Sequence, residues 1–155
     1  MSPPSQSRLQ SIAHRVDAIF TPLAQLLTRL VFGQAFLIAG LGKLKDLDQA
    51  VKNFEAMGIP MANVQAPFIA ALEFGGGILL LAGLGTRVFA FLLSCTMVVA
   101  FATTEMSRFP KGFTLEVDFS DITPLPFLVG MLWLLAKGAG KLSLDHLLAR
   151  RAGRA

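Results

Sequence analysis

The chain has 155 residues, enough for one domain, of which 54% are hydrophobic and only 15% are charged. Soluble domains carry roughly 25% charged residues, so the composition indicates a membrane protein and excludes an ordinary soluble domain. The net charge of +4 does not indicate nucleic-acid binding, because the basic residues flank apolar segments instead of forming one face.

The N-terminal segment, residues 1–22, begins with a stretch rich in Pro, Ser and Gln. From Leu9 to Phe20, apolar residues recur at helical spacing, with polar residues mostly on the other side. We predict a short amphipathic helix here that lies on the membrane surface. The segment has no apolar core followed by a cleavage site, so a signal peptide is not expected.

Four apolar runs follow, at about 23–41, 66–84, 88–104 and 122–136. A membrane-spanning helix needs about 20 mostly apolar residues, so each run is a candidate span. The fourth run is the shortest and begins with Pro124 and Pro126, which fit the first turn of a helix. We therefore predict an all-α fold. Residues 23–139 are predicted to form a transmembrane four-helix bundle, and residues 140–155 a basic cytoplasmic tail.

The connections between the runs fix part of the topology. Residues 85–87 join the second and third runs, so those helices must form an antiparallel hairpin. The connection 42–65 contains a short amphipathic helix that ends near Gly58, and alternation within 105–121 favours an extended surface segment. Lys and Arg residues are more numerous on the side of the two termini, which predicts that both termini are cytoplasmic.

Two charged residues lie inside predicted spans. A charge in the bilayer costs several kcal/mol, by contested estimates, so such residues usually face other helices and find partners. Arg29 shares one helical stripe with Gly33, Gly40 and Lys43, and Glu73 shares another with Gly76 and Gly77. Glycines beside a charge let a neighbouring backbone approach closely, so we predict that the two stripes face each other.

The partner of Glu73 is the next question. Distances along the two helices favour Arg29 first and Lys43 second, with Gln34 nearly level with Glu73. Three roles remain open: a structural ion pair that fixes helix register, a polar cavity for a small ligand or quinone headgroup, and a proton relay. Arg87, in the tight turn, is expected to anchor that turn at the membrane surface. The candidate ligand-binding or buried polar cluster is therefore Arg29, Gln34, Lys43, Glu73 and Arg87.

No catalytic residues are predicted, because the sequence has no GxSxG, phosphate-binding loop or HExxH motif. Metal binding is not expected, because Asp118 and Asp121 have no His or Cys nearby. Haem is not expected either, since His14 and His146 lie outside the spans. The single cysteine, Cys95, is interpreted as a packing residue.

Four stretches of the sequence resemble the DoxX family of small four-helix bacterial membrane proteins. They are "LTRLVFGQAFLIAGLGKLKD", "FEAMGIP", "ALEFGGGILLLAGLGTR" and "GAGKLSLDHLLARR", and the resemblance covers about residues 27–151. It implies a four-helix bundle in the bacterial inner membrane, with Arg29, Lys43, Glu73 and Arg87 at the recurring polar positions of the family. The connection 105–121 departs from the His- and Gly/Trp-containing loop that many relatives carry.

The resemblance also implies a link to membrane oxidoreductases, because some relatives are subunits of a thiosulfate:quinone oxidoreductase and others are tied to sulfur metabolism or oxidative stress. We expect a membrane subunit or anchor of such a system, more a non-catalytic component than an enzyme alone, with a quinone as candidate cofactor. The expected partners are membrane lipid, oxidoreductase subunits and a second copy of the chain. The alternatives are a small-molecule transporter or permeation protein that uses the same polar pocket, and a structural scaffold without ligand.

Overall fold

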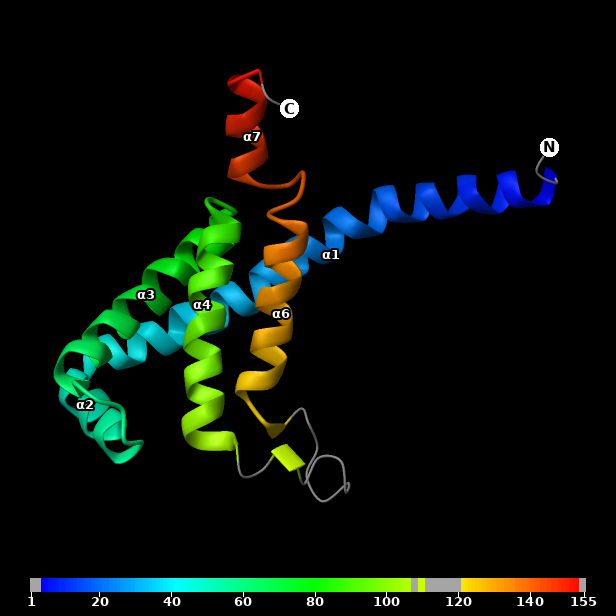
Figure 1. Ribbon diagram of the computed structural model, residues 1–155. Helices are drawn as coiled ribbons and strands as arrows, with labels where there is room; N and C mark the ends of the chain where they lie inside the picture. Colours follow the sequence, from blue (N-terminus) through cyan, green and yellow to red (C-terminus); the bar gives the residue numbers. More distant parts are fainter. Residues whose placement is uncertain (1–3, 107–108, 111–120, 154–155) are drawn as a thin grey trace.

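The computed structural model describes residues 4–106, 109–110 and 121–153, with only the backbone described for residues 4–15 and 17. The chain folds into helices α1 (Pro4–Lys45), α2 (Leu47–Ala56), α3 (Ala62–Ala82), α4 (Thr86–Ala100), α6 (Pro124–Lys137) and α7 (Leu144–Arg151) (Figure 1). A π-helical turn, η1 (Phe101–Glu105), continues α4. Within the described residues there is no strand, so the predicted all-α class is confirmed.

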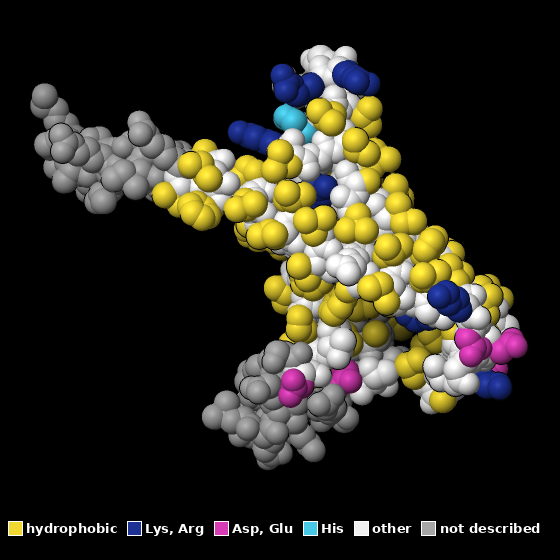
Figure 2. Space-filling view, turned by 180° about the vertical axis from the view of Figure 1, so that it is seen from behind, with side chains coloured by type: hydrophobic (Ala, Val, Ile, Leu, Met, Phe, Trp, Pro, Cys, Tyr) yellow, Lys and Arg dark blue, Asp and Glu magenta, His cyan; other side chains and the backbone are white. Residues whose placement is uncertain are grey.

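Three helices are long and apolar enough to cross a membrane: Ala18–Lys45, Ala62–Ala82 and Thr86–Glu105. They correspond to the first three predicted spans, although α3 ends at Ala82, two residues before the predicted end of the second span. The fourth, α6, has 14 residues and a length of roughly 21 Å, short of the hydrocarbon thickness of about 30 Å. A fourth crossing therefore stays a prediction. Large hydrophobic side chains remain exposed on all of these helices, as expected where lipid is the solvent (Figure 2).

The structure differs from the prediction at the N-terminus, because the expected surface helix is not a separate element. It is continuous with the first span in the single 42-residue helix α1. Pro22 lies inside α1, and a proline that removes one backbone hydrogen bond can bend a helix without ending it. The part of α1 before Pro22 extends away from the packed helices (Figure 1).

Helices α1 and α3 approach each other through the glycines that the sequence singled out. A Cβ atom on Gly40 would lie 2.3 Å from the backbone nitrogen of Phe74, and one on Gly77 would lie 2.5 Å from that of Leu37. Such distances leave no room for any side chain, so glycine is what allows this contact. The predicted close packing of α1 and α3 through glycine is confirmed for Gly33, Gly40 and Gly77, whereas Gly76 packs against Leu93 of α4.

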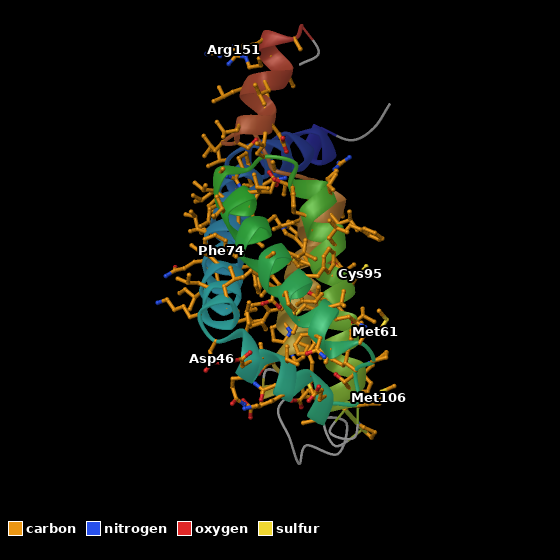
Figure 3. All side chains as sticks on the ribbon, turned by 90° about the vertical axis from the view of Figure 1, so that its left-hand side faces the viewer. Asp46, Met61, Phe74, Cys95, Met106 and Arg151 are labelled. Carbon is orange, nitrogen blue, oxygen red and sulfur yellow. The ribbon has the colours of Figure 1, made fainter. Side chains whose placement is uncertain are left out.

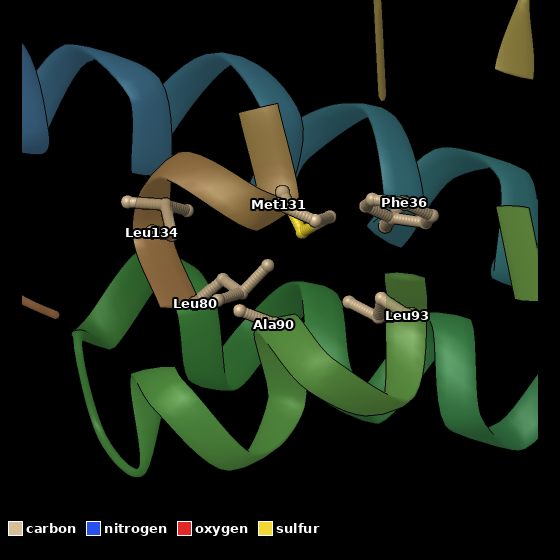
Figure 4. Packing of buried hydrophobic residues seen from close by; sticks show 6 residues of the cluster. All are labelled: Phe36, Leu80, Ala90, Leu93, Met131 and Leu134. Atoms are coloured by element: carbon tan, nitrogen blue, oxygen red, sulfur yellow. The ribbon is translucent and has the colours of Figure 1, made fainter. Parts of the chain in front are cut away.

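The core is shared by four helices (Figure 4). Its fully buried residues come from α1, α3, α4 and α6, and they are Phe36, Leu80, Ala90, Leu93, Met131 and Leu134. A second, smaller cluster packs α2 against the start of α3. The predicted hairpin of α3 and α4 is confirmed, with Gly83 and Gly85 at positive φ in the turn. Most of the extended segment predicted at 105–121 lies outside the described residues.

Candidate functional site

The five predicted site residues do not form one cluster. Arg29 and Arg87 lie near the α3–α4 turn and the connection from α6 to α7, whereas Lys43 and Glu73 meet nearer the α2 end. Figure 3 shows these two ends, with Arg151 of α7 at one and Asp46 and Met106 at the other. Gln34 belongs to neither group, because its side chain is exposed.

Arg29 is almost completely buried and uses backbone carbonyl groups as partners. Its Nε donates to the carbonyl of Leu80 at 2.9 Å and its Nη2 to that of Leu81 at 3.0 Å. Its Nη1 donates to the carbonyls of Ala139 and Leu142, both at 2.8 Å. One guanidinium therefore joins the end of α3 to the chain between α6 and α7.

The favoured pairing of Arg29 with Glu73 is wrong, and the chemistry of helix ends explains why. The last carbonyl groups of a helix lack intrahelical donors, and α3 ends beside Arg29. A planar guanidinium with five N–H donors satisfies several such carbonyls at once. Gly83 provides the space, because a Cβ atom there would lie 2.6 Å from Cζ of Arg29.

The chain around Arg29 carries further polar contacts that the sequence did not single out. The two carboxylate oxygens of Asp145 accept from the backbone nitrogens of Gly85 at 2.8 Å and Thr86 at 3.2 Å, at the N-terminus of α4. The backbone nitrogen of Asp145 donates in turn to the carbonyl of Gly83. Gln25, also buried, donates to the carbonyl of Lys137. The signal was present in the tail, where Ser143-x-Asp145 fits a helix start.

Glu73 forms an ion pair with Lys43, the second of the two predicted partners. The Nζ of Lys43 donates to Oε2 of Glu73. The Glu73 side chain is 5% exposed and that of Lys43 is 29% exposed, so the acid is enclosed and the base remains accessible. Lys43 lies on the last turn of α1, and its long side chain reaches inward along the helix to the acid.

This ion pair lines two cavities. One, of about 290 Å³, lies among α2, α3 and α4, where Lys43 and Glu73 are joined by apolar side chains such as Phe54, Ile69 and Met97. Cys95 and Thr96 complete its wall on α4. The other, of about 210 Å³, lies among α1, α4 and α6, with Phe36 and Phe127 in its wall. An apolar cavity with a small number of precisely oriented polar groups is typical of small-molecule sites.

The other two predicted residues have simpler surroundings. Gln34 follows Gly33 directly, so it is turned by about 100° from the glycine stripe and cannot reach Glu73. Arg87 makes one long contact, from Nη2 to the carbonyl of Ala136 at 3.4 Å. Within the described residues, no three His, Cys, Asp or Glu side chains lie close enough together to hold a metal ion.

Comparison with known proteins identifies relatives of this chain. It is 36% identical to the "Uncharacterized membrane protein Rv3486" of Mycobacterium tuberculosis over 84% of this chain and 85% of that protein. It is 32% identical to the "Inner membrane protein YqjF" of Escherichia coli over 81% of this chain and 92% of that protein. It is also 32% identical to the "Putative oxidoreductase CatD" of Bacillus subtilis, over 63% of this chain and 70% of that protein.

No solved structure matches the chain. The DoxX family model matches residues 24–106, a range that contains Arg29, Lys43, Glu73 and Arg87 and the whole of α2, α3 and α4. Together with the relatives and the three apolar helices, this match shows that the chain is a membrane protein of the DoxX family.

Proposed function

We propose that this protein is a membrane component of an oxidoreductase system and that it binds a quinone headgroup at the Lys43–Glu73 ion pair. One observation carries the proposal: an enclosed carboxylate and an accessible ammonium group share the wall of an otherwise apolar cavity of about 290 Å³. Ligand cavities begin at about 300 Å³, so this one suits a single ring and not a large substrate.

The chemistry of a quinone fits these walls. Its ring and substituents are apolar and pack against side chains such as Phe54, Ile69 and Met97. Its carbonyl oxygens accept hydrogen bonds, and Lys43 has three N–H donors of which one is directed to Glu73. The proposed oxidoreductase partner supplies the electrons that reduce the quinone. This accords with the role of a subunit or anchor.

Among the relatives named above, CatD supports the oxidoreductase link through its name, and it matches 63% of this chain. We place the protein in the inner membrane with both termini in the cytoplasm. Basic side chains gather at the α7 end, whereas the α2 end carries both basic and acidic ones (Figure 2). The larger number of Lys and Arg residues on the side of the two termini supports this orientation by the positive-inside rule. A C-terminal fusion to a reporter that functions only in the cytoplasm should therefore be active, and a fusion to a reporter that functions only outside the cytoplasm should be inactive.

Protection of Cys95 tests the binding proposal directly. Cys95 is the one cysteine of the chain, is exposed and lines the cavity. We expect a short-chain, fully substituted benzoquinone to slow its reaction with a maleimide several-fold in nanodiscs, whereas decanol, which only partitions into the bilayer, leaves the rate unchanged. Lys43→Met and Glu73→Gln should abolish the protection.

Lys45→Gln is the matched control, because Lys45 ends the same helix and lies outside both cavities. Thermal unfolding confirms that each variant is folded before labelling. Equal protection in Lys43→Met, or no protection of the unmodified protein, would overturn the proposal. In that case the ion pair is a structural contact that fixes the register of α1 and α3.

A second candidate function is permeation of a small polar molecule. It is favoured by the position of the ion pair in the walls of both cavities, where movement of Lys43 could join them. Liposomes that contain the purified protein should then show solute flux that Glu73→Gln changes. Flux that is the same in the variant, or absent from both, removes this candidate.

A further inference from the structure

A groove between α1 and α6 is apolar along most of its length. The groove has a volume of about 560 Å³. The α1 side is formed by Thr28 and Phe32, and the α6 side by Val129 and Trp133. Val129 is 63% exposed, so one wall of the groove is open to the surroundings of the protein. The groove is distinct from the proposed quinone site, with which it shares no residue.

At its α7 end the groove meets a cavity of opposite character. This cavity, of about 780 Å³, is lined by three cations, Arg87, Lys137 and Lys141, together with His146. One carboxylate, Asp145, also lines it, but both of its oxygens accept from the backbone at the start of α4. The cations that line the cavity therefore outnumber its carboxylates, and both oxygens of its one carboxylate already have donors.

The two spaces are consecutive along the same helices. On α1, Thr21 and Gln25 line the basic cavity, and Thr28 and Phe32 continue the same helical stripe into the apolar groove. On α6, Lys137 lines the first and Trp133 the second, with Nζ of Lys137 5.5 Å from the centre of the Trp133 ring. The basic cavity and the apolar groove together form one continuous amphipathic groove along the protein surface, which we call the channel and which is not a path through the membrane.

The length of the channel matches one leaflet of a bilayer. From Lys137 to Leu125, at the far end of the groove, α6 rises by about 18 Å, and half of the hydrocarbon core is about 15 Å. A ligand that fits this channel has an anionic head at the membrane surface and an apolar chain that reaches the bilayer centre.

We propose that the channel is a binding site for an anionic phospholipid. Its phosphate lies among Arg87, Lys137 and Lys141, and one acyl chain lies over Phe32 and Trp133 in the α1–α6 groove. Charge complementarity selects this occupant over a zwitterionic lipid and over an apolar helix of a partner, which would leave the basic cavity unmatched. Basic pockets between membrane helices bind such headgroups elsewhere.

Trp133 provides the measurement, because it is the one tryptophan of the chain, and the chain has no tyrosine. The full-length protein is placed in phosphatidylcholine vesicles in which a fraction of the lipid is replaced by phosphatidylglycerol with brominated acyl chains. Bromine quenches a tryptophan that it contacts. We expect quenching of Trp133 to show that brominated phosphatidylglycerol is enriched at the channel roughly fivefold over brominated phosphatidylcholine. This factor corresponds to about 1 kcal/mol, the contribution of one basic residue near an anionic lipid.

Two variants test the two halves of the channel. Lys137→Gln/Lys141→Gln should reduce the enrichment to about one, whereas Lys45→Gln/Lys52→Gln, which removes two cations near the α2 end, should leave it unchanged. Val129→Phe should reduce quenching by both brominated lipids, whereas Val98→Phe, an exposed position on α4 outside the groove, should not. Each variant is compared with itself in lipid without bromine.

Three results would overturn the proposal. The first is equal quenching by the two brominated lipids in the unmodified protein. The second is competition by soluble glycerol phosphate, which would show that the basic cavity binds phosphate without a lipid chain. The third is a loss of Trp133 quenching that accompanies dimer formation as the protein concentration rises, which would show that a second copy of the chain covers the groove.

Discussion

The two ends of the α1–α3 contact hold their charged residues in different ways. Arg29 is enclosed, and its four hydrogen bonds go to backbone carbonyls of two separate segments, the end of α3 and the chain between α6 and α7. Lys43 is partly exposed, and its described partner is the side chain of Glu73, beside two cavities. In the first arrangement the guanidinium is buried and hydrogen-bonded to the backbone, whereas in the second the ion pair lines cavities that leave room for a ligand.

This difference teaches that a charge inside a membrane span does not by itself mark a binding site. Backbone carbonyls are present in every sequence, so a cation that uses them fixes the fold and does not depend on a particular side chain. An ion pair between side chains can be opened when another donor or acceptor enters. The following predictions test whether the two ends divide in this way.

The largest effect is expected for Arg29→Met. The variant keeps the apolar stem but leaves four carbonyls without this donor, and a charge-assisted hydrogen bond contributes about 1.5–3 kcal/mol. We expect the free energy of unfolding in detergent to fall by about 4 kcal/mol or the protein not to accumulate. Arg87→Met, which removes an exposed arginine with one long contact, should change it by less than about 0.5 kcal/mol.

The second-largest loss of stability is expected at the close contact of α1 with α3, which lies between the Arg29 end and the Lys43–Glu73 end. Gly40→Ala places a methyl group against the backbone of α3, so the helices must separate, and we expect a loss of about 2–3 kcal/mol. Gly42→Ala is the matched control on the same helix, where an added Cβ atom meets nothing within 4 Å. It should be neutral or stabilising by up to about 1 kcal/mol. Similar losses in both variants would contradict the packing described here.

A smaller effect is expected at the start of α4. Asp145→Asn keeps one acceptor oxygen for Gly85 or Thr86 but removes the negative charge from the helix N-terminus, at a cost of about 1 kcal/mol. Protection of the amides of residues 85 and 86 from hydrogen exchange should fall with it. Glu55→Gln on α2 serves as the control, and unchanged exchange in Asp145→Asn would exclude this capping role.

The smallest change in stability is expected for the double variant Lys43→Met/Glu73→Leu. Replacement of a buried ion pair by apolar residues of similar size is often neutral or stabilising, so unfolding should shift by less than about 1 kcal/mol. A loss as large as that of Arg29→Met would mean that the two ends serve the same structural purpose. Unfolding is measured by the fluorescence of Trp133.

Much of the fold followed from the sequence because its signals are local. Apolar runs predicted four spans, of which three correspond to helices long and apolar enough to cross a membrane. The tight turn at residues 85–87 predicted the hairpin, and the glycine stripes predicted the close contact of α1 with α3. The continuity of α1 through Pro22 was not predictable from periodicity, because a proline either ends or bends a helix depending on the packing around it.

The site was predicted only in part. Glu73 was expected to turn inward, and it does, but heights along two helices could not decide between Arg29 and Lys43. The decision comes from the chain after α6, whose carbonyls at Ala139 and Leu142 receive Arg29 and leave Glu73 to Lys43. That long-range contact has no local signal, and Gln25 was missed for the same reason. Asp145 had a local signal as part of a helix start, but nothing in that signal indicates its contact with the start of α4.

The most direct test compares Arg29→Gln with Glu73→Gln for both stability and quinone binding. We predict that Arg29→Gln strongly lowers the melting temperature, and that Glu73→Gln melts near the unmodified protein but is no longer stabilised by a short-chain benzoquinone. If Glu73→Gln is stabilised by the quinone as fully as the unmodified protein, the assignment of the Lys43–Glu73 end as a ligand site is contradicted.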